Sequence, residues 1–237
     1  MRNEAVLAIL PPRYVPKRGP LVEAKSPASG AFCLSMKFML GTKGKMTQVF
    51  DETGVVHAVT IVKAEPLTVT QVKTQEKDAY TAVQVGAGTR KEKNLSAAVR
   101  GHLKDLGSFR YLREFASDAT MSRGDKVEIS SFVPGDVVEV SAISKGKGFQ
   151  GVVKRHGFKG GPRSHGQKNK ERSPGSIGGG GRAGGRVVKG MRMAGRMGGD
   201  RVTVKNLRIV QVDPSTNTIL VSGAVPGRPG TLVEIRG

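Results

Sequence analysis

The residues with the clearest chemical potential are cations in one glycine-rich segment. Between residues 154 and 201, thirteen lysines and arginines face only Glu171 and Asp200, so these 48 residues hold +11 of the chain's net charge of +20. Fifteen of the 33 glycines lie in the same segment. Cations at this density repel one another unless a polyanion neutralises them, and glycine lets backbone approach a surface closely. Because such a stretch buries little on its own, the pattern predicts an arm that becomes ordered against nucleic acid.

The composition of the whole chain fits that prediction. An isoelectric point near 10.5 implies an acidic partner, with nucleic acid first and a membrane surface a distant second. Cys33 is the only cysteine, which excludes a disulfide framework and a thiolate zinc cluster and fits a reducing, intracellular setting. An apolar run at 5–10 ends at Pro11 and Pro12, and no run approaches the roughly 20 residues that span a bilayer. We expect a cytoplasmic protein with one or two modest domains and no membrane contact.

A dinucleotide site is the first alternative. Residues 146–151 read G-x-G-x-x-G after an expected strand, and Glu171 has the spacing of a ribose-binding acid. That site needs a helix opening at the third glycine, and we expect the glycines and proline at 157–162 to leave no room for one. The sequence favours a bend where a strand leaves the β-structure, with Lys145 and Lys147 directed at phosphate.

Other catalytic and metal-binding patterns fail on spacing. The chain lacks a Walker phosphate loop, and residues 175–178 lack the spacing of a nucleophile elbow. His57 is expected in a strand and His102 on a helix. His156 and His165 lie in the arm without a neighbouring carboxylate or thiolate, so they are expected to contact RNA or pack locally. We therefore expect no catalytic residue, no metal site, no cofactor and no small-molecule substrate.

The arm admits more than one interpretation. Residues 180–186 resemble a disordered segment of the RGG type. Apolar side chains scattered through the arm argue instead for packing at a defined place: Ile177, Val187, Val188, Met191, Met193 and Met197. Phe158 is its only aromatic residue, and proteins that read loose single strands stack bases on aromatic rings. The remaining interpretation is charge neutralisation and shape fit inside a folded RNA.

Strand-like segments flank the arm, so it is an internal excursion anchored at both ends. The expected strands are 36–40, 46–50, 55–62, 67–72, 80–85, 109–115, 126–129 and 136–143 before it, and 202–212, 218–221 and 231–235 after it. The glycines at 41–44 and the run at 51–54 are expected to break the first strands, and 214–217 forms a turn. An excursion of this length reaches at most about 80 Å from its base.

One segment changes from strand to helix periodicity. Asn94 can cap a helix over 94–106, and Gly107 can end it. The apolar positions follow the i, i+3, i+4 rule and are Leu95, Ala98, Val99, His102, Leu103 and Leu106. Residues 1–35 hold five prolines and scattered charge without a period, which predicts a flexible N-terminal extension. The alternative that Met36 is the true start stays open.

A series of short runs, in order along the chain, resembles the universal large-subunit ribosomal protein family L-three of the bacterial type. The resemblance covers about 36–236. Its runs are Leu40-Gly41-Thr42-Lys43, Met46-Thr47, Ser144-Lys145-Gly146-Lys147-Gly148-Phe149-Gln150-Gly151, Lys154-Arg155-His156-Gly157-Phe158, His165-Gly166, Pro174-Gly175-Ser176-Ile177-Gly178, Gly185-Arg186-Val187, Lys189-Gly190, Met193-Ala194-Gly195-Arg196-Met197-Gly198, Arg201-Val202-Thr203-Val204 and Gly223-Ala224-Val225-Pro226-Gly227.

The resemblance implies a mainly β fold with an α+β insertion. A six-stranded β-barrel of the translation-protein type would comprise 36–62 plus 131–237, with a smaller inserted α/β unit at 63–130 and an extended rRNA-binding arm at 154–201. Family members bind large-subunit (23S-type) rRNA early in assembly, near its 3′ end, and contact neighbouring ribosomal proteins. They thread the loop toward the peptidyl transferase centre, where RNA performs the catalysis. A free-standing RNA chaperone or RNA-binding regulator stays open as the alternative function.

The expected rRNA-binding residues combine the resemblance with the charge. They are Lys145, Lys147, Lys154, Arg155, His156, Lys159, Arg163, His165, Lys168, Lys170, Arg172, Arg182, Arg186, Lys189, Arg192, Arg196 and Arg201, with a loop tip of Gly178, Gly179, Gly180 and Gly181. The chain departs from the family pattern at Lys45, where glycine is usual before Met-Thr. It departs again at Gly179, where some members carry a methylated glutamine, so that modification has no substrate here.

Overall fold

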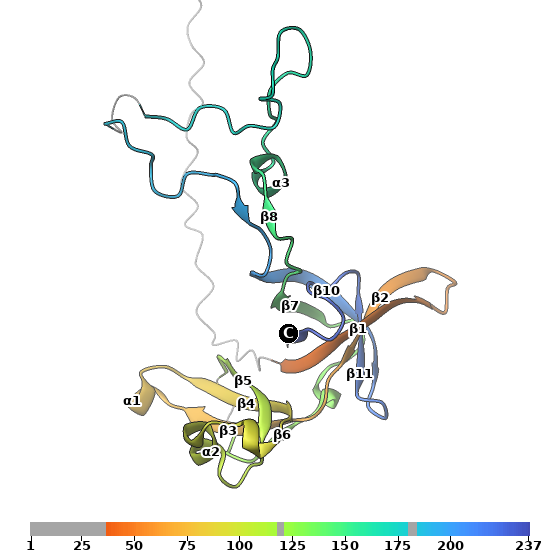
Figure 1. Ribbon diagram of the computed structural model, residues 1–237. Coiled ribbons are helices and arrows are strands. Elements are labelled where there is room, and N and C mark those ends of the chain that lie inside the picture. The colour runs from red at the N-terminus through yellow and green to blue at the C-terminus, as the bar shows by residue number, and fades with distance from the viewer. Residues whose placement is uncertain (1–36, 118–120, 180–183) are drawn as a thin grey trace, which may run out of the picture. The chain divides into compact units, whose positions relative to one another are not determined.

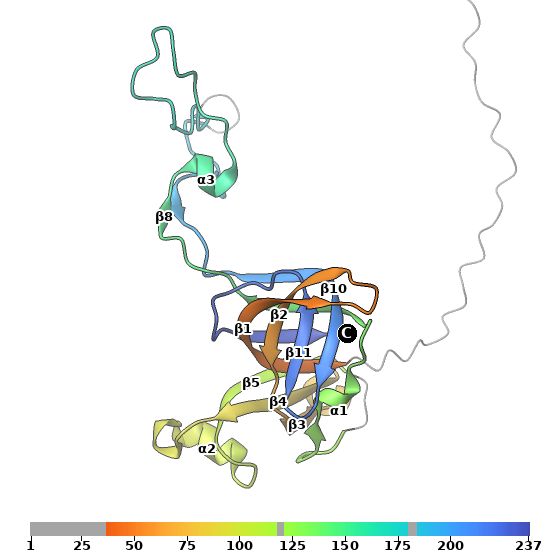
Figure 2. The same cartoon turned by 90° about the vertical axis from the view of Figure 1, so that its right-hand side faces the viewer.

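The computed structural model describes residues 37–117, 121–179 and 184–237, and its largest feature is a closed barrel of six antiparallel strands (Figures 1 and 2). The strands follow one another around the barrel in the order β1-β12-β7-β10-β11-β2. Their bounds are β1 (Phe38–Phe50), β2 (Val56–Lys63), β7 (Val137–Ile143), β10 (Arg201–Asp213), β11 (Thr218–Ser222) and β12 (Leu232–Arg236). The expected six-stranded barrel is confirmed. The expectations for residues 1–35 and for Gly180, Gly181 and Arg182 concern positions outside the described residues.

The expected break at 41–44 is wrong, because β1 runs through these glycines without interruption. A Cβ on Gly41 would lie 2.5 Å from Cγ1 of Val62 on β2, so glycine here permits two barrel strands to approach closely. The register between β1 and β2 shifts between Lys43 and Met46, so the next glycine, Gly44, lies at a local irregularity inside the strand. Glycine in this strand serves packing and does not end it.

A second sheet lies between β2 and β7 in the sequence. Its strands have the order β5-β4-β3-β6. Their bounds are β3 (Leu67–Lys73), β4 (Ala82–Thr89), β5 (Phe109–Phe115) and β6 (Lys126–Val127), with the short helix α1 (Gln75–Asp78) between β3 and β4 and the 3-10 turn η2 (Ile129–Ser131) after β6. The sequence did not predict α1, and β4 begins and ends later than the expected strand at 80–85.

Barrel and second sheet share one hydrophobic core. Met39, Val140 and Ile235 from the barrel are fully buried together with Val69 from β3. The ring of Phe38 at the start of β1 stacks on Phe115 at the end of β5, with centroids 4.7 Å apart. Burial of a large apolar side chain stabilises a fold by about 1.5–3 kcal/mol, so this continuous packing holds the second sheet against the barrel.

The expected helix at 94–106 is shorter and begins later. The 3-10 turn η1 (Glu92–Asn94) precedes it, and the helix α2 spans Ala97–Leu103 with Ser96 as its N-cap, since Ser96 Oγ accepts a hydrogen bond from the Val99 N–H at 3.4 Å. The expected Asn94 cap is therefore wrong. Leu103 is the buried residue of α2, whereas Leu95 and Leu106 are half-buried outside it and Ala98 and His102 are exposed. The apolar period was right for position 103 but extended the helix into its flanking loops.

The arm leaves the barrel after β7 and returns at β10. Within it lie β8 (Phe149–Gln150), α3 (Val152–His156) and β9 (Gly195–Arg196). No helix in the described ranges is long and apolar enough to cross a membrane.

Candidate nucleic-acid interface

The two ends of the arm start from neighbouring strands of the barrel. Arg201, the first residue of β10, is paired with Ile143, the last residue of β7. Beyond this pair the Ser144 N–H donates to the Asp200 carbonyl at 2.9 Å, and β8 then pairs with β9 (Figure 1). The root of the arm is thus a two-stranded ribbon that continues the barrel, which confirms the expectation of an excursion anchored in β-structure.

The G-x-G-x-x-G segment forms this ribbon and one helical turn. The expectation that no helix could open after Gly151 is wrong, because Gly151 is the N-cap of α3. The helix has only five residues and ends at Gly157 in the left-handed conformation. It ends early because a left-handed glycine terminates the hydrogen-bonding pattern. The segment therefore positions the start of the arm, and the cations around it lie on a ribbon.

Two glycines are required by close backbone contacts inside the arm. A Cβ on Gly198 would lie 2.2 Å from the carbonyl oxygen of Lys145, and one on Gly160 would lie 2.2 Å from that of Glu171. Both glycines also have positive φ. Larger residues would separate the two sides of the ribbon at the first position and open a loop at the second.

Most of the predicted contact residues are exposed. The exposed ones are Lys145, Lys147, Lys154, Lys159, Arg163, His165, Lys168, Lys170, Arg172, Arg186, Lys189, Arg192, Arg196 and Arg201. Arg155 and His156 are half-buried, because Arg155 Nη1 donates to the Met193 carbonyl at 2.8 Å and His156 Nε2 lies 3.0 Å from the same oxygen. His156 also packs on Phe158, with ring centroids 6.0 Å apart. Local packing, one of the two expectations for His156, thus accounts for its position.

A groove of about 750 Å³ at the arm root brings some of these cations together. Its walls include Lys145, Lys147, Arg155 and Arg196. Lys43 from β1 also lines the groove, and sequence reasoning missed it as a site residue. Its only signal was its place in a run that resembles the ribosomal family, since Lys43 and Lys145 are 145 − 43 = 102 positions apart in the sequence.

Lys43 is held beneath the groove by main-chain acceptors. Its Nζ donates to the carbonyls of Val225 at 2.5 Å and Gly227 at 2.9 Å. Burial, and secondly the nearby charge of Lys145, lower the pKa of Lys43. Lys43 therefore contributes a partly buried amine at the base of a groove whose walls carry further cations.

Ion pairing in the arm is sparse in the part that the structure describes. Within 154–179 and 184–201, Arg163 pairs with Glu171 at 2.6 Å and Arg201 pairs with Glu234 of β12. The other described cations of the arm have no carboxylate within ion-pair distance among the described residues.

At the expected tip, Gly178 and Gly179 are exposed with φ of +88° and +114°. Among the described residues, no group of three or more His, Cys, Asp or Glu could hold a metal ion.

Comparison with known proteins gives one consistent family. The family model described as Ribosomal protein L3 matches residues 81–224. The chain is 52% identical over 201 residues to the "Large ribosomal subunit protein uL3" of Roseiflexus sp., covering 84% of this chain and 95% of that protein. It is 49% identical to the protein of the same name from Acidothermus cellulolyticus, covering 85% and 92%, and 47% identical to that of Finegoldia magna, covering 85% and 97%.

These relatives match 84–85% of this chain, and the match of the family model at 81–224 includes the arm at 154–201. The match to this family is the reason to describe the chain as a structural protein without enzymatic activity. The chain belongs to the ribosomal protein L3 family.

Proposed function

We propose that this chain is a structural constituent of the large ribosomal subunit and binds its 23S-type rRNA through the arm. The observation that carries the proposal is a ribbon-rooted arm with exposed cations that mostly lack carboxylate partners among the described residues. The relatives are each named as a large ribosomal subunit protein, which supports the large subunit as the assembly in which the arm would act. The ribosome is accordingly the place where we expect the chain.

The arm's chemistry suits contact with RNA backbone. Lysine and arginine neutralise phosphates irrespective of sequence, while base identity is read by hydrogen bonds to base edges. Between residues 154 and 201 the single aromatic ring, Phe158, is half-buried and packs near His156, whereas Phe149 in β8 at the root of the arm is exposed. Phe158 is therefore a poor platform for stacking bases, and beyond its root the arm offers mainly shape and charge for recognition.

The proposal includes the position and timing that the family resemblance implies. The arm would extend toward the peptidyl transferase centre, its binding near the rRNA 3′ end would begin assembly, and the barrel would contact neighbouring ribosomal proteins. The ribbon at the root supports this arrangement, because it fixes the direction in which the arm leaves the barrel.

Quantifying the chain in purified large subunits tests the proposal. We expect it to be equimolar with the large-subunit rRNA and to stay bound through a salt wash that removes loosely associated proteins. A free-standing RNA chaperone or regulator would be present well below equimolar amounts and would wash off. That second result would contradict a structural role even though the arm still bound RNA.

A further inference from the structure

The hairpin formed by β1 and β2 extends beyond the barrel (Figure 1). β12 pairs with β1 over 38–42, and β11 pairs with β2 over 59–63. Residues 48–58, which we call the hairpin end, are therefore a two-stranded ribbon in which β1 and β2 pair with each other and with no further strand of the described chain. The main-chain groups along such an unpaired strand edge match those of another polypeptide.

The hairpin end exposes large apolar side chains on both of its faces. Phe50 is 64% exposed and is paired with Val56, which is 50% exposed, so these two lie on one face. Val55 is 53% exposed and lies on the other face, because successive side chains of a strand alternate. Apolar side chains that gather at one exposed place mark an interaction site, and a bare two-stranded ribbon buries too little to need them for its own stability.

Main-chain hydrogen bonds close the turn of the hairpin end. The Asp51 N–H donates to the Val55 carbonyl at 2.9 Å, and the Gly54 N–H donates to the Asp51 carbonyl at 2.8 Å. Gly54 has a φ of +81°, which glycine adopts without strain. The apolar side chains therefore stand on a preformed turn, so that docking them orders little additional backbone.

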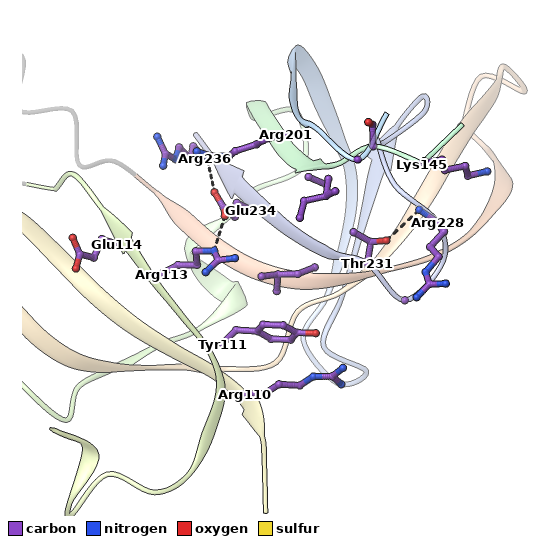
Figure 3. Close-up of a pocket in the computed structure, with 17 residues that line it drawn as sticks. Arg110, Tyr111, Arg113, Glu114, Lys145, Arg201, Arg228, Thr231, Glu234 and Arg236 are labelled. Atoms are coloured by element: carbon purple, nitrogen blue, oxygen red, sulfur yellow. Dashed lines mark hydrogen bonds and ion pairs between the residues drawn. The ribbon is translucent and has the colours of Figure 1, made fainter. Parts of the chain in front are cut away.

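The hairpin end is acidic although the whole chain has a net charge of +20. Residues 48–58 contain the exposed Asp51 and Glu52 and no lysine or arginine. Asp51 Oδ2 lies 3.9 Å from His57 Nε2, at the long limit of an ion pair. The body differs elsewhere, since six cationic side chains and two carboxylates line the cleft between β5 and β12 (Figure 3). Carboxylates beside apolar side chains repel phosphate and attract cations.

We propose that the hairpin end is a docking site for a neighbouring protein of the large subunit, one that presents lysine or arginine around an apolar surface. The inference rests on the ribosomal function proposed above. RNA is disfavoured as the occupant, because the hairpin end offers no lysine or arginine to phosphate. A second copy of this chain is disfavoured, because two hairpin ends would bring their carboxylates together. A basic protein suits both the carboxylates and the apolar side chains.

Photo-crosslinking in purified large subunits tests the site in the full chain. Phe50 is replaced by benzoylphenylalanine, the subunits are isolated and irradiated, and the crosslinked peptide is identified by mass spectrometry. The crosslink should reach one other large-subunit protein, at a peptide that carries lysine or arginine. The matched control places the same group at Tyr80, an aromatic residue after α1 that is 44% exposed, and should not reach that protein.

Every other crosslinking result would overturn the proposal. These results are a crosslink from position 50 to rRNA, to a second copy of the chain, to the chain itself or to a peptide without lysine or arginine. The same protein reached from both positions, or no crosslink at all, would overturn it too.

Charge reversal measures what the carboxylates contribute. With the photo-reactive group at position 50, Asp51→Lys with Glu52→Lys should lower the crosslink yield to the neighbour by about fivefold or more, since like charges then face each other. Glu76→Lys with Asp105→Lys makes the same change of charge at exposed positions outside the hairpin end and should leave the yield within about twofold. Equal yields from the two variants would contradict a basic partner.

The same subunits separate this inference from the proposed function. If the chain is equimolar with the large-subunit rRNA but position 50 reaches no other protein, the docking proposal fails and the ribosomal function stands. If the chain is absent from purified large subunits, the proposed function itself fails.

Discussion

The arm and the body of the protein differ in how their charged side chains are paired. In the body several ion pairs join separate elements, as where Lys37 lies 2.7 Å from Asp136 or Glu234 accepts from Arg113 and Arg201. In the described arm, Arg163–Glu171 is the one ion pair formed between two arm residues. The body packs around its own hydrophobic core, whereas most described cations of the arm have no carboxylate partner in the described chain. The difference is the one expected if folding determines the first region and, as proposed above, RNA orders the second.

Glycine shows the same division. On β4 a Cβ at Gly86 would lie 2.5 Å from the Phe109 ring, so packing requires glycine there. At the arm tip a Cβ on Gly178 or Gly179 would meet nothing within 4 Å, yet both residues have positive φ. The body uses glycine to bring strands and rings together, whereas Gly178 and Gly179 adopt backbone conformations that favour glycine.

The largest expected effect on stability lies in the body. Leu103→Ala on α2 should reduce the free energy of unfolding by about 2–5 kcal/mol, because this side chain is 2% exposed. Denaturant unfolding measures the loss, and RNA affinity of the folded variant should barely change. Leu106→Ala, at a half-buried position, is the matched control and should lose less. A loss for Leu103→Ala below about 0.5 kcal/mol would show that burial here does not stabilise the body.

Removing charge from the arm should lower rRNA affinity and leave stability unchanged. Arg172→Gln with Arg192→Gln should lower rRNA affinity by roughly 10- to 60-fold near 0.1 M salt, with unfolding unchanged, because both side chains are exposed and have no carboxylate partner in the described chain. Filter binding across a salt series measures it. Glu171→Gln is the opposite-sign control and should raise affinity, since it frees Arg163. Equal affinities for all three proteins would contradict the contrast between the regions.

A smaller effect is expected at the Lys37–Asp136 pair. Hydrogen bonds from Lys37 Nζ at 2.7 Å and secondly from the Val133 N–H at 3.0 Å lower the pKa of Asp136. Its contribution is therefore fully present above the unfolded pKa of about 3.9 and is lost as pH falls through the lower, folded value.

Asp136→Asn should accordingly lower the free energy of unfolding by about 1 kcal/mol near neutral pH. The difference in that free energy between the variant and the unmodified chain should disappear in acid. Asp105→Asn, an exposed position, is the control and should leave stability unchanged. Thermal unfolding at several pH values measures both. A difference that grew as the pH was lowered would show that the sign of the linkage is wrong.

The smallest effect on affinity is expected at the arm tip. Replacing the glycines at 178–181 with alanine should leave initial rRNA affinity within about threefold, less than ~0.7 kcal/mol, because these residues carry no charge. Subunit maturation or peptidyl transfer should be hindered, since Gly178 and Gly179 have φ values that alanine adopts at a cost. Gly151→Ala, at φ −70°, is the control and should assemble normally. Normal assembly of the tip variant would make the tip a passive turn.

Local patterns in the sequence predicted much of this fold. The expected strand at 109–115 matches β5 (Phe109–Phe115), and the expected strands at 136–143 and 202–212 correspond to β7 and β10 on either side of the arm. The break at 41–44 was wrong because the contact between Gly41 and Val62 is made by a neighbouring strand, which local sequence does not reveal. The N-cap was wrong for a different, local reason, because Ser96 lies two residues after Asn94 and either polar side chain can cap a helix.

The positive charge of the arm could also be predicted from the sequence, because its cations are close together along the chain. The groove at the arm root could not be predicted in this way. Lys43, Lys145 and Arg196 come from three separate parts of the chain, and the strand order of the barrel with the pairing of β8 and β9 brings them together. A site whose residues are brought together by strand pairing can be recognised only once the fold is known.

The central claim is that the arm supplies charge for RNA while the body folds independently, and the salt dependence of rRNA affinity with and without residues 160–197 tests it most directly. If about eight cations of the intact chain engage phosphates, log K should fall against log salt with a slope of roughly −6. Deleting 160–197 should remove most of that slope while the barrel unfolds at an unchanged denaturant midpoint. A slope shallower than about −2 for the intact chain, or a deletion that unfolds the barrel, would contradict the account.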